Sequence, residues 1–291
     1  MRSSEEIKRL IIDVAKNDDR VRAILLNGSR ANDKISPDKY QDFDIVYIVN
    51  DIESFISNKT WASVFGEKLI WQLPDEMLVG KKGPEKGEKF ALLMLFTDGN
   101  RIDLTLLPKN EIRPNYKADS LTIVWLDKDN MFSDIGLPDD SDYLVKQPTE
   151  KEFLDTCNEF WWVCTYVAKG LARNEIIYSK DMLETVVRPM FMSVISWHIG
   201  IETNFSVSVG KSGKFINRFL PPNLYKRILQ TYSDHTLKNN WKSLFLMTEI
   251  FGQLARAVSG QLKFTYMITE EENVVTYLNQ LYKEPTTRDK V

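Results

Sequence analysis

Two aspartates separated by a single residue stand where an apolar segment begins. Asp42 and Asp44 flank Phe43, and the residues from Phe43 to Val49 have the composition of a β-strand. Side chains alternate along a strand, so both carboxylates point to one face while Phe43 points into a core. Carboxylate oxygens are ligands that hard cations such as Mg²⁺ prefer. The spacing therefore predicts a Mg²⁺ site at Asp42 and Asp44.

A glycine-containing turn precedes these acids. The apolar run from Val21 to Leu26 is typical of a buried strand, and Gly28, Ser29 and Arg30 follow it. Gly28 permits a tight turn in which the backbone approaches its neighbours closely. Ser29 and the nearby N–H groups could then hold a phosphate beside the metal. Arg30 has two open interpretations, a phosphate ligand or a solvated loop cation.

A third aspartate, Asp103, lies inside another apolar run, two residues after Arg101. A carboxylate in such a position is costly unless it is paired or bound to a metal. Two partners are open: a metal ion shared with Asp42 and Asp44, or the guanidinium of Arg101.

The elements that must position these acids alternate between strand-like and helical patterns. A helix capped by Ser3 or Ser4 is followed by strands at 21–26, 43–49 and 69–73, a hairpin of 90–97 and 101–107 around Asp98-Gly99-Asn100, and a strand at 121–126. We expect a mixed sheet covered by helices over residues 1–148.

The second half of the chain is helical in pattern. A stretch rich in Asp, Pro and Ser from Ser133 to Thr149 is typical of a long loop, and helical spacing follows near 149–172, 179–200, 221–231, 235–258 and 269–283. Pro189 should kink or interrupt the second of these helices. The chain is thus predicted to be α+β, with an α-helical bundle over residues 149–291.

The predicted helix at 149–172 has two distinct faces. Core positions are expected at Phe153, Cys157, Phe160, Cys164, Val167 and Leu171. A separate stripe is formed by Asp155, Glu159, Trp162 and Tyr166. Acids beside aromatics suit a guanidinium-bearing sugar, although the two rings could equally fill an interface. Three other tryptophans, Trp61, Trp71 and Trp125, are expected in the core.

A glycine-rich turn with two lysines, from Val209 to Lys214, lies in the helical half. It lacks the first glycine of a Walker loop, where Phe205 stands. If the turn opens a helix, Lys211 or Lys214 could hold a triphosphate there. The alternative is a plain solvated turn.

Composition narrows the class of protein. The net charge is −3 on 291 residues and a basic stripe is lacking, which argues against a nucleic-acid partner. Cys157 and Cys164 are two helical turns apart, too far for a disulfide, so we expect buried thiols. The polar N-terminus is unlike a signal peptide, and the longest apolar run, Phe90 to Phe96, is too short to span a membrane. We expect a cytoplasmic monomer without membrane contact.

The order of these motifs resembles the nucleotidyltransferase superfamily, whose pattern is a hydrophobic residue, Gly-Ser, a spacer, Asp-x-Asp and a third acid on a later strand. Over nearly its full length the chain also resembles the aminoglycoside 6-adenylyltransferase family, the streptomycin-modifying type. The segments that carry this resemblance are Leu26 to Asn32, Gln41 to Tyr47, Asn100 to Thr105 and Glu159 to Trp162.

The resemblance implies transfer of AMP from ATP to the 6-hydroxyl of streptomycin, with release of pyrophosphate and resistance to the antibiotic. It implies a nucleotidyltransferase fold ahead of a helical substrate-binding domain. Asp42 and Asp44 would hold two Mg²⁺ ions at the triphosphate, and Asp103 would deprotonate the hydroxyl or share the metal. ATP would contact Gly28, Ser29, Arg30 and either Lys211 or Lys214.

Two other functions remain open from the sequence. One is a nucleotidyltransferase that acts on another small molecule, a protein or an RNA, of which RNA fits the acidic balance least. The other is a nucleotide-binding module without catalysis, against which the presence of all three carboxylates argues.

Overall fold

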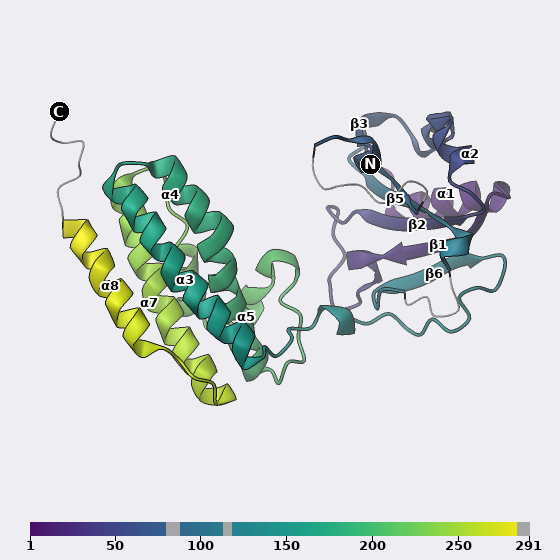
Figure 1. Cartoon of the computed structure of the whole chain (residues 1–291). Coiled ribbons are helices and arrows are strands. Elements are labelled where there is room, and N and C mark those ends of the chain that lie inside the picture. The colour runs from purple at the N-terminus through teal and green to yellow at the C-terminus, as the bar shows by residue number, and fades with distance from the viewer. Residues whose placement is uncertain (80–87, 113–117, 284–291) are drawn as a thin grey trace. The chain divides into compact units, whose positions relative to one another are not determined.

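The computed structural model describes residues 1–79, 88–112 and 118–283. The chain forms two compact units, Met1–Asp142 and Tyr143–Val291 (Figure 1). The first unit contains a mixed sheet with helices and the second is helical, so the chain is α+β as predicted. The boundary between the two units follows Asp142, slightly before the predicted boundary between residues 148 and 149.

Six strands form the sheet of the first unit, in the order β3-β4-β5-β2-β1-β6. Their bounds are β1 Val21–Asn27, β2 Phe43–Val49, β3 Lys68–Gln72, β4 Phe90–Phe96, β5 Arg101–Pro108 and β6 Thr122–Asp127. Only β2 and β5 pair in parallel, while the neighbours β4 and β5 form the predicted hairpin. Every predicted strand is confirmed to within two residues at its ends.

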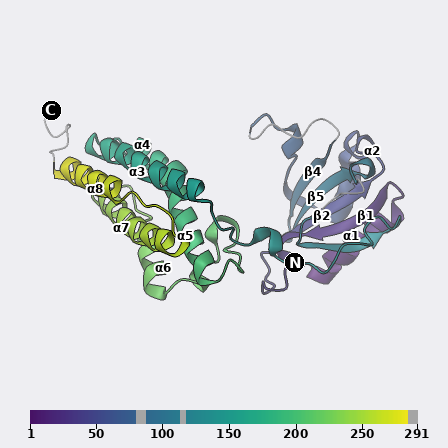
Figure 2. The same cartoon turned by 60° about the horizontal axis from the view of Figure 1, so that its bottom comes forward.

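One face of this sheet is covered by helix α1, Ser4–Asn17, and by the short segments α2, Glu53–Ile56, and Lys59–Phe65 (Figure 2). Ser3 caps α1 in a capping box with Glu6, which satisfies free backbone N–H groups at the helix start. Ile7 and Ile11 are buried, and Ile11 accepts a 2.7 Å hydrogen bond from the Tyr47 hydroxyl of β2. The odd-numbered residues of β2 therefore face α1.

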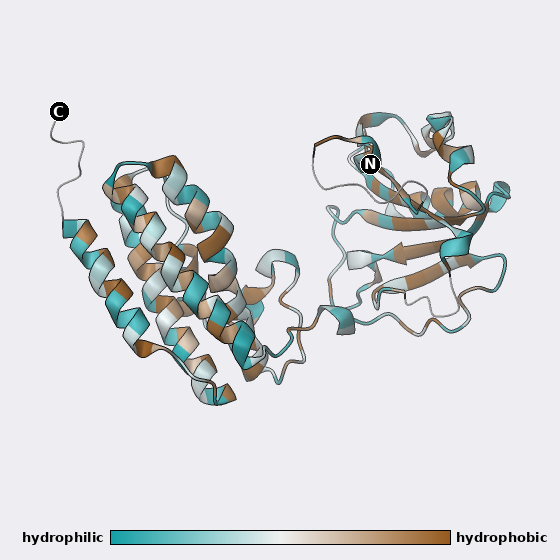
Figure 3. Cartoon of the chain, viewed as in Figure 1, coloured by the Kyte–Doolittle hydropathy of each residue, from teal (hydrophilic) through white to brown (hydrophobic). Residues whose placement is uncertain are grey.

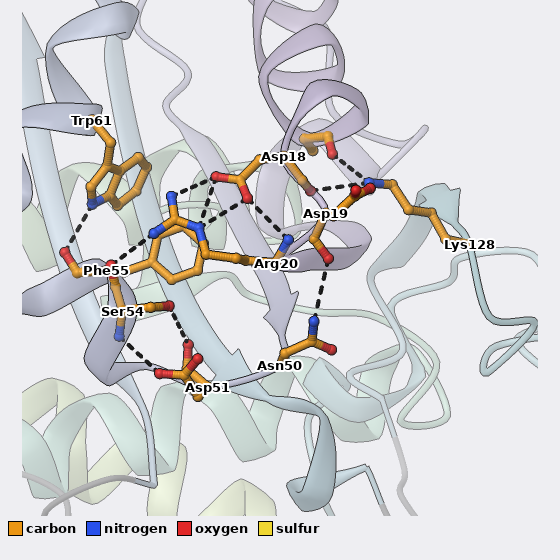
Figure 4. A network of polar contacts seen from close by, with 10 residues as sticks. Asp18, Asp19, Arg20, Asn50, Asp51, Ser54, Phe55, Trp61 and Lys128 are labelled. Carbon is orange, nitrogen blue, oxygen red and sulfur yellow. Dashed lines mark hydrogen bonds and ion pairs between the residues drawn. The ribbon is translucent and has the colours of Figure 1, made fainter.

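A polar network fixes the end of α1 to the sheet (Figure 4). Arg20 pairs with Asp18, donates to the Ser54 carbonyl and stacks on the Phe55 ring at 4.0 Å. Lys128, just beyond β6, donates to the carbonyl oxygen of Asp18. These contacts connect α1, α2 and β6 at the end of the sheet where β1 begins.

The opposite face of the sheet is covered only in part by its own unit. Phe132, from the chain after β6, packs on Leu25 and Ile48 in a small second core. On β4, Leu93 and Leu95 point to this face and are half-buried, and they belong to neither hydrophobic core of the described first unit. Around Leu93 and Leu95, this face is therefore left open by the described residues of the first unit.

The second unit consists of helices packed around one hydrophobic core. Apolar and polar segments alternate along its helices, as expected when each helix buries one side (Figure 3). The helices are α3 Glu150–Ala172, α4 Ile176–Met182, α5 Arg188–Glu202, α6 Pro222–Leu229, α7 Leu237–Leu262 and α8 Ile268–Lys283. All six predicted core positions of α3 are buried, the two free cysteines included.

The predicted interruption at Pro189 is confirmed. A π-helical turn, Leu183–Val187, separates α4 from α5, and Pro189 stands in the first turn of α5. Proline lacks a backbone N–H and is tolerated at that position, whereas a continuous helix would lose a hydrogen bond there. In the described residues, no helix is long and apolar enough to cross a membrane.

Candidate active site

The register of the sheet brings the three aspartates together. Asp44 of β2 lies directly opposite Asp103 of β5 in the parallel ladder. Asp42, two residues before Asp44, projects to the same open face, and Phe43 between them is buried on the other side. The predicted alternation is confirmed, and the third acid does come from the neighbouring strand.

Arg101 neutralises part of this acidic group. Its guanidinium donates two hydrogen bonds to the Asp103 carboxylate, at 2.7 and 2.8 Å, and lies 3.6 Å from an oxygen of Asp42. The fork of Arg101 fits a carboxylate in this two-bond manner. The ion pair that the sequence left open for Asp103 is therefore present.

The charge on this face is not fully balanced. Burial raises the pKa of Asp44 to about 6, and repulsion from the Asp103 and Asp42 carboxylates adds to the rise. Burial likewise raises the pKa of Asp42, against the attraction of Arg101. A group of acids that resists ionisation in this way gains from an additional cation.

The glycine turn lies against one of these acids. Gly28 opens a short 3₁₀ turn, Gly28–Ala31, with a φ of +74°, the left-handed region that favours glycine. A β-carbon at Gly28 would overlap sterically with an oxygen of the Asp44 carboxylate. The turn thus has the tight backbone and the close approach that the sequence predicted, and it places Ser29 beside the acids.

Arg30 has a role that neither sequence interpretation described. Its guanidinium donates to the backbone carbonyls of Asp42 and Gln41, at 2.9 and 2.7 Å, and lies 3.8 Å from the centre of the Phe43 ring. The solvated loop cation is therefore wrong, because the side chain is held between the turn and β2. In this position Arg30 fixes the backbone that carries Asp42, and its contact with ATP stays a prediction.

The donor set has the chemistry of a divalent-cation site. Three carboxylates on one sheet face, two of them with raised pKa values, offer the hard oxygen ligands that a divalent cation prefers. As they stand, however, no three acidic, His or Cys side chains of the described chain are grouped closely enough to hold a metal. Arg101 holds Asp103, so a metal ion that took Asp103 as a ligand would compete with that guanidinium.

The predicted stripe lies on the exposed face of α3. Trp162 is 58% exposed and donates to the Tyr166 hydroxyl at 2.7 Å, while Asp155 pairs with Lys151 one turn away. Glu159, between them, is also exposed. The four side chains share one helix face, as the spacing predicted. Tyr166 is half-buried and packs against the core of the second unit, whereas the other three lie outside that core.

The turn with two lysines differs from the prediction in one respect. It does not open an α-helix: Lys211–Gly213 is a short 3₁₀ turn, and α6 begins only at Pro222. Positive φ values at Gly210, Ser212 and Gly213 prevent a regular helix from starting there. Lys211 and Lys214 are exposed, and Ser212 and Gly213 line a pocket of about 710 Å³ within the second unit.

One tryptophan that the sequence placed in the core is exposed. We expected Trp71 in the core, but it is 40% exposed and lines a pocket with Tyr40, Asp42 and Arg101. Trp71 lies on the edge strand β3, where only one neighbouring strand is available to cover it. The run from Phe90 to Phe96 is apolar on both faces, although helices cover only one face of the sheet. This run was a sequence signal for apolar surface outside the core.

Comparison with known proteins places the chain in a family. A family model described as streptomycin adenylyltransferase matches residues 1–281. The chain is 41% identical to the aminoglycoside 6-adenylyltransferase of Bacillus subtilis (strain 168) over 283 residues, 97% of this chain and 99% of that protein. The chain belongs to this family. Membership makes it an enzyme, a nucleotidyltransferase, which agrees with the superfamily that its motifs indicated.

Two further proteins extend the comparison. An aminoglycoside 6-adenylyltransferase of Campylobacter jejuni is 41% identical over 272 residues, 94% of this chain and 93% of that protein. A crystal structure of an aminoglycoside 6-adenyltransferase from Bacillus subtilis is 38% identical, with 98% of this chain and all of that chain covered and a TM-score of 0.48.

Proposed function

We propose that this member of the family transfers AMP from ATP to the 6-hydroxyl of streptomycin and releases pyrophosphate, which would inactivate the antibiotic. The observation that carries the proposal is the cluster of Asp42, Asp44 and Asp103 on one open sheet face, with the Gly28 turn in contact with Asp44. The names of the relatives support an aminoglycoside as the acceptor.

The acid cluster is proposed to hold Mg²⁺. Asp42 and Asp44 would be the principal ligands, with Asp103 as a third ligand if it does not act as the base. Two ions would neutralise the charge of the triphosphate and the leaving pyrophosphate. The register of β2 and β5 fixes the positions of the carboxylates, so these side chains need not be rearranged at the moment of reaction. Arg101, once released from Asp103, would be free to pair with phosphate oxygens.

Asp103 is proposed to accept the proton of the acceptor hydroxyl. A bond forms between that hydroxyl oxygen and the α-phosphorus, the bond from the α-phosphorus to the bridging oxygen breaks, and pyrophosphate leaves with both bonding electrons. The side chain of Asp103 is 19% exposed, so it can be reached from the open face.

The remaining contacts are assigned by chemistry. Backbone N–H groups at Gly28 and the Ser29 hydroxyl would bind phosphate oxygens, with Lys211 or Lys214 adding positive charge. The stripe from Asp155 to Tyr166 would bind the cationic groups of the acceptor, since exposed carboxylates and aromatic faces both attract guanidinium. We expect the enzyme to work as a cytoplasmic monomer.

Pyrophosphate release with a panel of acceptors tests the proposal. The purified protein is incubated with ATP and Mg²⁺ and with streptomycin, kanamycin or spectinomycin. We expect release with streptomycin and little with the other two. Release with kanamycin or spectinomycin alone would move the acceptor to another aminoglycoside, and Mg²⁺ binding without release for any acceptor would favour a catalytically silent module.

A further inference from the structure

Two polar side chains continue the row of acids across the sheet toward β6. In the ladders of β1, Asn27 lies opposite Asp44 of β2 on one side and opposite Thr122 of β6 on the other. Residues paired in this way project to the same face of a sheet. Asn27 is half-buried there, and Thr122 is 2% exposed. The amide of Asn27 therefore stands between a buried hydroxyl and an acid of the cluster.

The Asp44 carboxylate extends toward the strand that carries Asn27. One of its oxygens lies where a β-carbon of Gly28 would be, and Gly28 follows Asn27 directly in the chain. Residues that lie opposite each other in an antiparallel pair have their β-carbons about 5 Å apart. A ligand that the Asp44 carboxylate holds therefore lies next to the Asn27 side chain.

Thr122 fixes the orientation of the Asn27 amide. The Thr122 hydroxyl donates a 2.9 Å hydrogen bond to Asn27 Oδ1, which leaves the amino group, Nδ2, directed away from that hydroxyl. Asn27 stands at the cap position of the turn Gly28–Ala31, but its side chain forms no cap hydrogen bond. Among the described residues, no acceptor takes a hydrogen bond from Asn27 Nδ2. Such an amide can donate both of its N–H bonds to a ligand.

We propose that Asn27 Nδ2 binds an oxygen of the ATP triphosphate, and that Thr122 is a positioning residue that holds the amide for this contact. The inference rests on the proposed function, in which Asp44 and the Gly28 turn hold the phosphates. An amide suits this place because it donates hydrogen bonds to an anion without a net charge of its own. A lysine or arginine there would pair with the Asp44 carboxylate and compete with Mg²⁺, as Arg101 does at Asp103.

Two substitutions of Asn27 separate the donor from the acceptor role of its amide. Asn27→Ala removes both roles, whereas Asn27→Asp keeps an oxygen that accepts from Thr122 and loses the amino group. Both variants should raise the KM for ATP about tenfold, as expected for the loss of a hydrogen bond to a charged group, and leave the KM for streptomycin within about twofold. A wild-type KM for ATP in Asn27→Asp would overturn the inference, because the side chain would then act only as an acceptor.

The role of Thr122 is tested through its dependence on Asn27. Thr122→Val removes the hydroxyl and should raise the KM for ATP a few-fold, and Thr122→Ser, which restores a hydroxyl, should reverse most of that rise. In the Asn27→Ala background, Thr122→Val should add nothing further. An effect of full size in that background would contradict the positioning role. Asn50→Ala is the matched control, since Asn50 is exposed beyond the other end of β2, and it should leave both KM values unchanged.

ATP binding without turnover separates this inference from the proposed function. Equilibrium dialysis of labelled ATP with Mg²⁺ is done in the absence of any acceptor, with the wild type and with folded Asn27→Ala and Asn27→Asp. Binding about tenfold weaker in both variants supports the inference even if the wild type adenylylates another acceptor. Equal binding by all three proteins contradicts the inference alone, whereas a wild type that binds no ATP contradicts the proposed function as well.

Discussion

The acid cluster of the sheet and the stripe on α3 both combine carboxylates with other functional side chains, but they differ in how their charges are satisfied. Asp44 is half-buried, in contact with Gly28 and crowded by two other acids, and its pKa is raised. Asp155 is exposed and paired with Lys151 on its own helix. Poorly compensated charge below the surface lowers the stability of a protein, so its presence in the acid cluster strongly supports a catalytic role for that cluster. The stripe on α3 carries no such cost, and its role needs a functional test.

The largest effect should come from the cluster itself. Asp44→Asn should lower kcat by at least about 10³-fold, because it removes charge that the proposed metal ions need. The same substitution should raise the stability of the folded protein. The pKa of Asp44 is raised on folding, so the folded state loses stability as the pH rises from about 4 through about 6.

The amide cannot ionise, so without Mg²⁺ the variant should be more stable at pH 7, by about 1 kcal/mol. Steady-state kinetics and thermal unfolding at pH 5 and pH 7 measure both effects. An inactive but less stable variant would indicate a structural role for Asp44.

The second effect concerns the turn. Gly28→Ala should reduce kcat/KM by about 10²-fold, because a β-carbon strains the backbone at φ +74° and pushes the Asp44 carboxylate aside. Gly136→Ala is a matched control, since a β-carbon there would meet nothing within 4 Å. Near-normal kinetics for Gly28→Ala would show that the contact between the turn and Asp44 is not needed.

A smaller effect is expected at the lysine turn of the second unit. Lys211→Ala or Lys214→Ala should raise the KM for ATP about tenfold with little change in the KM for streptomycin, since an exposed lysine adds charge attraction to the triphosphate. The double variant shows whether either lysine can compensate for the loss of the other. If all three proteins have the wild-type KM for ATP, the turn is a plain solvated one.

The smallest effects are expected on the stripe. Trp162→Ala should raise the KM for streptomycin a few-fold, about the value of an exposed cation–π contact. Asp155→Ala should change the free energy of unfolding by less than about 0.5 kcal/mol, because an exposed ion pair on one helix is weak. If neither change affects streptomycin, the stripe is ordinary surface and the contrast with the acid cluster becomes sharper.

The strands, the helices and the pair of Asp42 and Asp44 could be predicted because each depends on local spacing. The alternation of Asp42, Phe43 and Asp44 fixes their faces, and the hairpin turn at Gly99 sets where Asp103 lies along β5. The roles of Arg30 and Trp71 could not be predicted in this way. Arg30 bonds to backbone carbonyls eleven and twelve residues away, and the exposure of Trp71 depends on β3 being an edge strand. Strand order is a property of the whole sheet that local spacing does not contain.

The central claim is that the open sheet face with Asp42, Asp44 and Asp103 performs adenylyl transfer to an aminoglycoside. Mass spectrometry of streptomycin after incubation with ATP and Mg²⁺, with the wild type and with Asp44→Asn side by side, tests it most directly. We predict that the wild type converts streptomycin to a product heavier by one adenylyl group and that Asp44→Asn leaves it unmodified. The same product from folded Asp44→Asn at a comparable rate would contradict the claim.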